Sequence, residues 1–93
     1  MKSIIPLPSF ERSLKKLTPH EKSLLAKSLE TFDEFVLSAK APFGFRFKKI
    51  NHDKYEFRID IRLRVVVKEI QDTFYLVLVG DHDTVRKYLK TFR

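Results

Sequence analysis

The hydrophobic period of this chain changes at Gly44, where a helical part is followed by a sheet part. Before Gly44, apolar residues recur at intervals of three and four, as along one face of an α-helix. After Gly44 they alternate with polar residues, as in a half-buried β-strand. Ninety-three residues suffice for one modest core. We therefore predict a single α+β domain over residues 1–93.

The helical part begins with a short strand and continues as a helical hairpin. Residues 3–7 are apolar and are interrupted by proline, which predicts an edge strand followed by a helix start. One apolar face over residues 9–17 predicts the first helix. Thr18 and Glu21 have the spacing of a capping box, with proline at the first helical position between them. They predict a second, longer helix that ends at about residue 38.

The sheet part is expected to be a small antiparallel meander of three strands. Residues 45–50 form the first strand, and residues 55–67 continue one alternation with a bend at Asp60. Residues 74–79 are apolar on both faces, which is typical of a central strand covered on both sides. Residues 80–83 then break this strand before a short basic helix, for which Asp81 or Asp83 is the expected cap. The predicted order is β-α-α-β-β-β-α.

The period of two also separates the two faces of the sheet. The apolar set is expected to face the helices: Phe57, Ile59, Ile61, Leu63, Val65 and Val67. The charged set is expected on the opposite face, with Arg46 or Lys48 beside it: Glu56, Arg58, Arg62 and Arg64.

Positive charge is the strongest compositional signal for function. Nineteen Lys and Arg against twelve Asp and Glu give a net charge of +7, which favours polyanions such as nucleic acid, anionic membranes or acidic proteins. A solvated surface that protects the sheet edge is the plainer interpretation. The closely spaced arginines favour phosphate contact, because guanidinium groups bind phosphate through two parallel hydrogen bonds. We interpret the charged face as a nucleic-acid interface.

Several other classes of function lack support in the sequence. There is no cysteine, the three histidines lie far apart, and the only glycines are Gly44 and Gly80, so neither a metal site nor a nucleotide cofactor is expected. The longest apolar run is too short to cross a bilayer, and the N-terminus lacks a secretory pattern. We expect a cytoplasmic protein with no membrane partner. The absence of a long apolar surface stripe predicts a monomer when free.

Four segments together carry a resemblance to a known family: Tyr55–Arg58, Arg62–Val67, Tyr75–Asp83, and Val85 with Tyr88. In this combination the chain resembles the RelE/ParE superfamily of toxins from type II toxin–antitoxin systems. The likeness covers almost the whole chain and is strongest from Tyr55 to Tyr88.

The resemblance implies an endonuclease that cuts mRNA on the ribosome without metal, by attack of the ribose 2′-hydroxyl on the neighbouring phosphate. It also implies a cognate antitoxin protein as partner. Arg64 matches the phosphate-stabilising arginine, His82 an acid or base, and Tyr88 an orienting or stacking group. The family's sheet lysines are replaced here by Glu56 and Arg58. Glu56 is then the candidate base, although a freely solvated carboxylate is a weak one.

Further basic residues complete the expected RNA-binding set: Arg46, Lys48, Lys49, Arg62 and Arg86. Two alternatives remain open at this point. One is an inhibitor of DNA gyrase, like the ParE branch, and the other is a catalytically inactive binding domain of the same fold. The presence of His82 and Tyr88 favours cleavage over gyrase inhibition, while the ambiguous general base leaves the inactive domain open.

Overall fold

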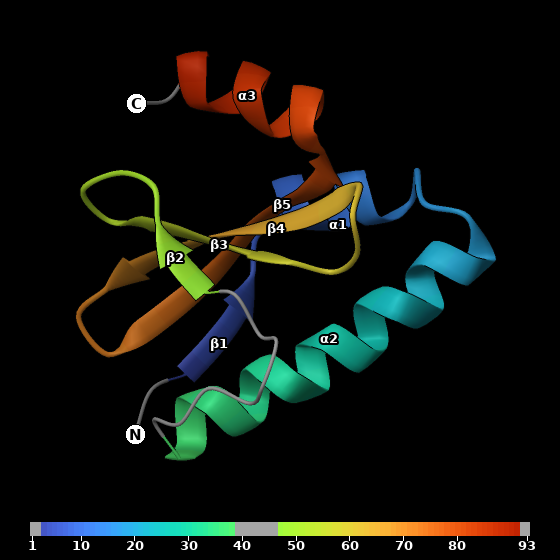
Figure 1. The fold of residues 1–93 in the computed structure, drawn as a ribbon. Helices are drawn as coiled ribbons and strands as arrows, with labels where there is room; N and C mark the ends of the chain where they lie inside the picture. Colours follow the sequence, from blue (N-terminus) through green and yellow to red (C-terminus); the bar gives the residue numbers. More distant parts are fainter. Residues whose placement is uncertain (1–2, 39–46, 92–93) are drawn as a thin grey trace.

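The computed structural model describes residues 3–38 and 47–91, which form a five-stranded sheet with three helices (Figure 1). The elements follow in the order β1 (Ser3–Pro6), α1 (Pro8–Leu14), α2 (Pro19–Ser38), β2 (Phe47–Lys49), β3 (Lys54–Arg58), β4 (Leu63–Ile70), β5 (Thr73–Asp81) and α3 (His82–Thr91). The predicted α+β class is confirmed. The predicted strand at residue 45 begins within the described part only at Phe47, so Arg46 lies outside the described residues.

The strand order in the sheet is β1-β5-β4-β3-β2. Strands β2 to β5 form an antiparallel meander, as expected, and β1 is an edge strand, also as expected. Because β1 pairs parallel with β5, the complete sheet is mixed. Figure 1 shows α2 on one face of this sheet and α3 on the other.

The meander has one strand more than predicted, because the expected bend at Asp60 is a full reversal of the chain. The Asp60 carboxylate Oδ1 accepts hydrogen bonds from the amides of Arg62 and Leu63, at 2.8 and 2.7 Å. A side chain that bonds backbone two or three residues ahead is a standard way to close a tight turn. Residues 55–67 are therefore two strands, β3 and β4, and the prediction of one bent strand is wrong.

The register of this hairpin explains why the alternation hid the turn. Phe57 pairs with Val65, so odd-numbered residues face the same side on both strands. The alternation thus continues through the reversal without a break in phase. Only Ile61 departs from its predicted face, because it lies at the tip of the hairpin and is 92% exposed.

Phe32 of α2 is the centre of the first core. It is fully buried, and its ring centroid lies 4.9 Å from that of Phe57, 5.4 Å from Phe74 and 5.6 Å from Phe47. Phe10 of α1 joins the same core, so both N-terminal helices cover this face. The predicted helix-facing set is confirmed here for Phe57, Ile59, Val65 and Val67, which are buried in this core or packed against it.

A second core lies on the opposite face, where α3 covers β4 and β5. Val85 of α3 packs there with Val66 and Val77, and Leu89 and Tyr88 pack against them. Strand β5 is therefore covered on both sides, as its composition predicted. Helix α3 therefore covers part of the face that was expected to be an open charged surface.

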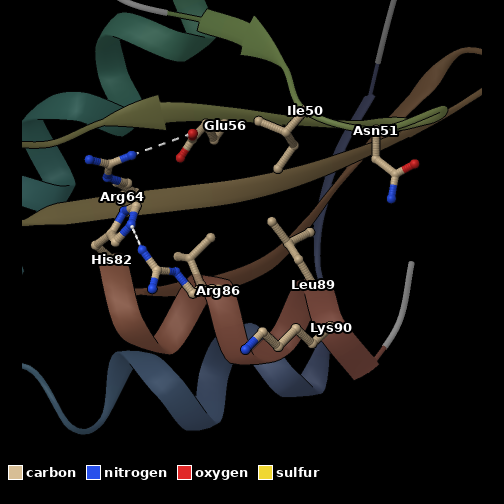
Figure 2. A pocket seen from close by; sticks show the side chains of 9 residues that line it. Ile50, Asn51, Glu56, Arg64, His82, Arg86, Leu89 and Lys90 are labelled. Atoms are coloured by element: carbon tan, nitrogen blue, oxygen red, sulfur yellow. Dashed lines mark hydrogen bonds and ion pairs between the residues drawn. The ribbon is translucent and has the colours of Figure 1, made fainter.

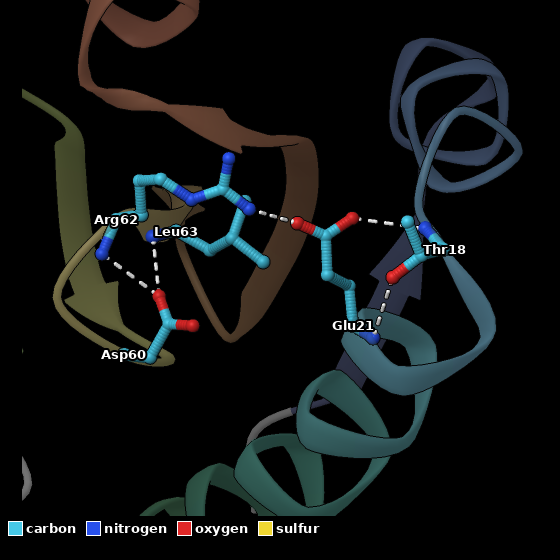
Figure 3. Close-up of polar contacts among 5 residues, drawn as sticks. All are labelled: Thr18, Glu21, Asp60, Arg62 and Leu63. Atoms are coloured by element: carbon cyan, nitrogen blue, oxygen red, sulfur yellow. Dashed lines mark hydrogen bonds and ion pairs between the residues drawn. The ribbon is translucent and has the colours of Figure 1, made fainter.

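The capping box at the start of α2 is confirmed (Figure 3). The Thr18 amide donates to Glu21 Oε1 at 2.9 Å, and the Glu21 amide donates to Thr18 Oγ1 at 3.1 Å. Glu21 also forms an ion pair with Arg62 in the β3–β4 turn. Glu21 thus joins the first turn of α2 to the hairpin. Helix α1 ends at Leu14, three residues earlier than predicted.

Among residues 3–38 and 47–91, no helix combines the length and the apolar character needed to span a bilayer.

Replacing Phe32 by Ala is expected to lower the free energy of unfolding by about 3–5 kcal/mol, because it removes the ring around which the first core packs. Leu37→Ala is the matched control on the same helix, since Leu37 is 65% exposed. Urea unfolding followed by circular dichroism measures both variants. Equal effects of the two substitutions would contradict the placement of Phe32.

Candidate active site

A cavity of about 430 Å³ opens between the β3–β4 face of the sheet and α3. Its lining residues are Ile50, Asn51, Glu56, Arg64, His82, Val85, Arg86, Leu89 and Lys90. Figure 2 shows Glu56, Arg64, His82 and Arg86 gathered on one side and Ile50, Asn51 and Leu89 on the other, with Lys90 next to Leu89. We call the group of Glu56, Arg64, His82 and Arg86 the ionic end, and the group of Ile50, Asn51 and Leu89 the apolar end.

Neighbouring strands bring Glu56 and Arg64 together at the ionic end. Glu56 Oε1 lies 3.5 Å from Arg64 Nη1 and 3.7 Å from Lys48 Nζ. The Glu56 and Arg64 side chains are only 8% and 13% exposed, whereas that of Lys48 is 64% exposed. The pair is therefore buried, and such a pair is destabilising unless further hydrogen bonds satisfy its remaining polar atoms.

Two polar atoms of this pair lack such hydrogen bonds. Glu56 Oε2 and Arg64 Nε are buried and have no hydrogen-bond partner among the described residues. One is an acceptor and the other a donor. Buried polar atoms are normally satisfied, so an exception calls for an explanation such as a bound water, an ion or a catalytic role.

His82 and Arg86 complete the ionic end from the first turns of α3. Arg86 Nη2 lies 2.8 Å from His82 Nε2. A guanidinium group only donates, so His82 Nε2 is the acceptor in this contact. An anion that attracted Arg86 would free Nε2 of His82 for proton transfer.

Gly80 allows α3 to begin directly above Arg64. Gly80 pairs with Arg64 across β4 and β5. A β-carbon at position 80 would lie 2.8 Å from Cγ2 of Thr84, closer than side chains tolerate. The absence of a side chain therefore lets the first turn of the helix pack onto the strand end and carries His82 to the cavity.

Asp81 caps the same helix, which resolves the two alternatives left by the sequence. Its Oδ1 accepts a hydrogen bond from the Thr84 amide at 2.8 Å. Hydrogen bonds from the Thr84 amide and hydroxyl, aided by the charges of Arg62 and Lys87, hold the pKa of Asp81 below its usual 3.8.

Three other predicted site residues, Lys48, Lys49 and Arg58, lie on β2 and β3 and do not line the cavity. Lys48 lies beside Glu56, and Arg58 is exposed and pairs with Arg64 across the hairpin. Lys49 follows Lys48 by one residue, so its side chain belongs to the opposite face, where it pairs with Tyr55. Whether these residues contact RNA stays a prediction.

Arg62 and Tyr88 also do not line the cavity. Arg62 was expected beside Arg64, and this placement is wrong, because the turn directs Arg62 to Glu21 and to a second cavity of about 380 Å³. Tyr88 packs against the second core instead. Burial, and secondly the charge of Asp53, raise the pKa of the Tyr88 hydroxyl above its usual 10.0. A role for either residue in the reaction stays a prediction.

Sequence reasoning did not select the residues of the apolar end. Ile50 and Leu89 read as ordinary core positions, and Asn51 as a turn residue. For Lys90 the sequence does contain a signal that it lies near the site. Lys90 follows Arg86 by four residues, and residues four apart share one face of a helix. Within the described residues, no cluster of three or more His, Cys, Asp or Glu side chains could hold a metal ion.

Comparison with known proteins gives similarity of structure without detectable similarity of sequence. No protein-family model matches the chain, and no curated protein sequence matches it. The fold is similar to that in the RelB–RelE antitoxin–toxin complex from Methanococcus jannaschii, with a TM-score of 0.68 and 19% identity over 90% of this chain and 96% of that one.

Two further solved structures have the same fold. YafQ from E. coli superimposes with a TM-score of 0.68 and 9% identity, over 91% of this chain and 98% of that chain. The YoeB dimer from Staphylococcus aureus gives a TM-score of 0.63 and 17% identity, over 87% and 97% of the two chains. The predicted RelE-like fold is therefore confirmed. Because these identities are low, they establish the fold alone.

Gly80→Ala is expected to destabilise the protein by about 1–3 kcal/mol, since the new methyl group overpacks against Thr84. Thr84→Ser removes the nearest methyl group while keeping the amide that Asp81 caps. In a double-mutant cycle by thermal unfolding, the pair of substitutions should therefore cost less than the sum of the two. Additive effects would contradict the close approach of these residues.

Asp81→Ala is expected to lower the melting temperature at neutral pH. Because the folded-state pKa of Asp81 is depressed, its contribution is present above the unfolded-state pKa and is lost as the pH falls through the folded-state pKa. The difference in melting temperature between wild type and Asp81→Ala should thus be constant above about pH 5 and shrink in stronger acid. A difference that grows on acidification would refute the cap.

Proposed function

We propose that this protein is the toxin of a toxin–antitoxin pair and that it cuts mRNA on the ribosome. The observation that carries the proposal is the Glu56–Arg64 ion pair, which lines one cavity together with His82 and Arg86. A ribose 2′-hydroxyl and its neighbouring phosphate match this carboxylate and these cationic groups in chemistry. The RelE-like fold and the net charge of +7 are consistent with this substrate.

In the proposed reaction, Glu56 accepts the proton of the 2′-hydroxyl while the 2′-oxygen attacks phosphorus. Arg64 and Arg86 stabilise the negative charge that develops on the phosphate in the transition state. Electrostatic stabilisation of this kind is usually the largest single contribution to catalysis. His82, released from Arg86 and protonated from solvent before the reaction, donates that proton to the departing 5′-oxygen. The bond from phosphorus to the 5′-oxygen breaks, and the products are a 2′,3′-cyclic phosphate and a free 5′-hydroxyl. None of these steps requires a metal ion.

The proposed partner is an antitoxin whose acidic side chains cover the same cations. The RelE and YafQ structures include complexes with RelB and with DinJ, which are described as antitoxin–toxin pairs. In this chain Arg86 lines the cavity, and the exposed Lys48 and Arg58 lie beside the Glu56–Arg64 pair, so such a segment would neutralise all three. We further propose that the free toxin is a cytoplasmic monomer.

The test is primer-extension mapping of mRNA in a bacterial translation reaction, with and without ribosomes. Glu56→Gln and His82→Ala are each expected to lower the cleavage rate by about 10²–10⁴-fold, the usual contribution of a general base or acid. Arg64→Ala should lower it by about 10²–10³-fold, the effect of removing one charge stabiliser. Lys27→Ala on the exposed side of α2 is the control and should cleave like wild type.

Glu56→Gln needs a stability control, because breaking a buried ion pair costs about 3–5 kcal/mol. The double variant Glu56→Gln, Arg64→Gln removes both charges and should recover part of the lost stability without recovering cleavage. Intact mRNA with folded wild-type protein would exclude the nuclease. DNA damage in cells expressing the protein would then favour gyrase inhibition, and its absence an inactive binding domain.

A further inference from the structure

The apolar end of the cavity is not used by the proposed reaction, although it is continuous with the ionic end. Figure 2 shows the side chains of Ile50 and Leu89 facing each other from the sheet side and from α3, with Asn51 beyond them. Both apolar side chains are only partly buried, so they remain available to a ligand. Small-molecule sites typically combine apolar walls with a few oriented polar groups.

The turn that carries Asn51 is fixed to the sheet. The amides of Ile50 and Asn51 both donate to the Lys54 carbonyl, at 2.9 and 3.3 Å. The Glu69 amide donates to the Asp53 carbonyl at 2.7 Å, which ties the turn to β4. Asp53 also lies 3.4 Å from Lys54 Nζ. A turn held at several points presents its side chains in one orientation, as a selective site requires.

The Asn51 amide group is itself oriented. Its Oδ1 accepts a hydrogen bond from the His52 amide at 2.7 Å. With the oxygen engaged in this way, the Nδ2 group is the part of the side chain that can donate to a ligand. The apolar end therefore offers two aliphatic walls and one fixed donor.

The distance between the two ends suits one nucleotide. Arg86 at the ionic end and Leu89 at the apolar end are about one turn of α3 apart, or roughly 5 Å along the helix axis. A phosphate at Arg64 and Arg86 would thus leave the attached base near Ile50 and Leu89. Enzymes that act on RNA commonly hold an unstacked base between apolar side chains and read its edge through hydrogen bonds.

We propose that the apolar end is a nucleobase subsite, in which Ile50 and Leu89 contact the faces of one base and Asn51 Nδ2 donates to an acceptor on its edge. This inference rests on the proposed function, because it assigns the base attached to the phosphate held at the ionic end. Asn51 is then a specificity-determining residue, which biases the sequence at which the chain cuts.

Binding can be tested without cleavage. Nucleoside 5′-monophosphates, ribose 5-phosphate and inorganic phosphate are titrated into the methyl-labelled wild-type protein and followed by NMR. The nucleotides should shift the methyl signals of Ile50 and Leu89 and bind about tenfold more tightly than ribose 5-phosphate, since contacts to one base are worth about this factor. Equal binding of all phosphates, with those methyl signals unmoved, would overturn the subsite.

Three variants identify the role of Asn51. Asn51→Asp keeps the oxygen that accepts from His52 and replaces the amide donor, so the turn is preserved while contact with a base acceptor is lost. Asn51→Ala removes both. His52→Ala is the control, because His52 is exposed, does not line the cavity, and contributes only its backbone amide to the Asn51 contact.

In mapped cleavage products, wild type and His52→Ala should share one preferred base at a fixed position beside the cut. Both Asn51 variants should lose about tenfold of that preference, a typical effect of one specific base contact. Cleavage with an unchanged preference in Asn51→Asp would overturn the subsite and leave the proposed nuclease intact. If the wild type does not cleave, the NMR titration still tests the subsite, so the two proposals fail separately.

Discussion

The buried ion pair between Glu56 and Arg64 places the strongest constraint on this structure. Two charges removed from water repay their desolvation only when the geometry is good and the remaining polar atoms are bonded. Here each partner keeps one unsatisfied atom, so the pair is a poor choice for stability alone. The β3–β4 register and helix α3, which covers this face of the sheet, hold the pair in a fixed position. The surrounding elements therefore stabilise an arrangement that would not stabilise itself.

Most of the fold follows from local signals in the sequence, because each acts over only a few residues. The capping box at Thr18 and Glu21, the edge strand before Pro6 and the doubly covered strand β5 were predictable for this reason. The hairpin at Asp60 was not predictable. Odd-numbered residues pair with odd-numbered residues across it, so the alternation of apolar and polar residues continues through the turn. Periodicity reports which face a residue occupies, and it carries no information on the direction of the strand. The carboxylate contacts of Asp60 supply that direction, and they depend on geometry that periodicity does not contain.

The candidate site was predicted in part, and the successes and failures have different causes. Glu56, Arg64 and His82 converge because strand alternation and the position of Gly80 fix where their side chains point. Arg62 does not join these residues, because it lies in the Asp60 turn, where its side chain no longer follows the strand alternation. It forms an ion pair with Glu21 instead. The apolar end was missed because its residues also pack against the second core. An apolar side chain that serves both packing and binding has the same sequence signal as one that serves packing alone.

A substrate that binds at the Glu56–Arg64 ion pair would also stabilise the fold. A ligand that binds only the folded protein stabilises it in proportion to the logarithm of its concentration above the dissociation constant. Under the proposed function, RNA and an acidic antitoxin segment compete for the same cations: Arg58, Arg64 and Arg86. Either ligand would therefore stabilise the folded protein, and the one that binds more tightly would exclude the other.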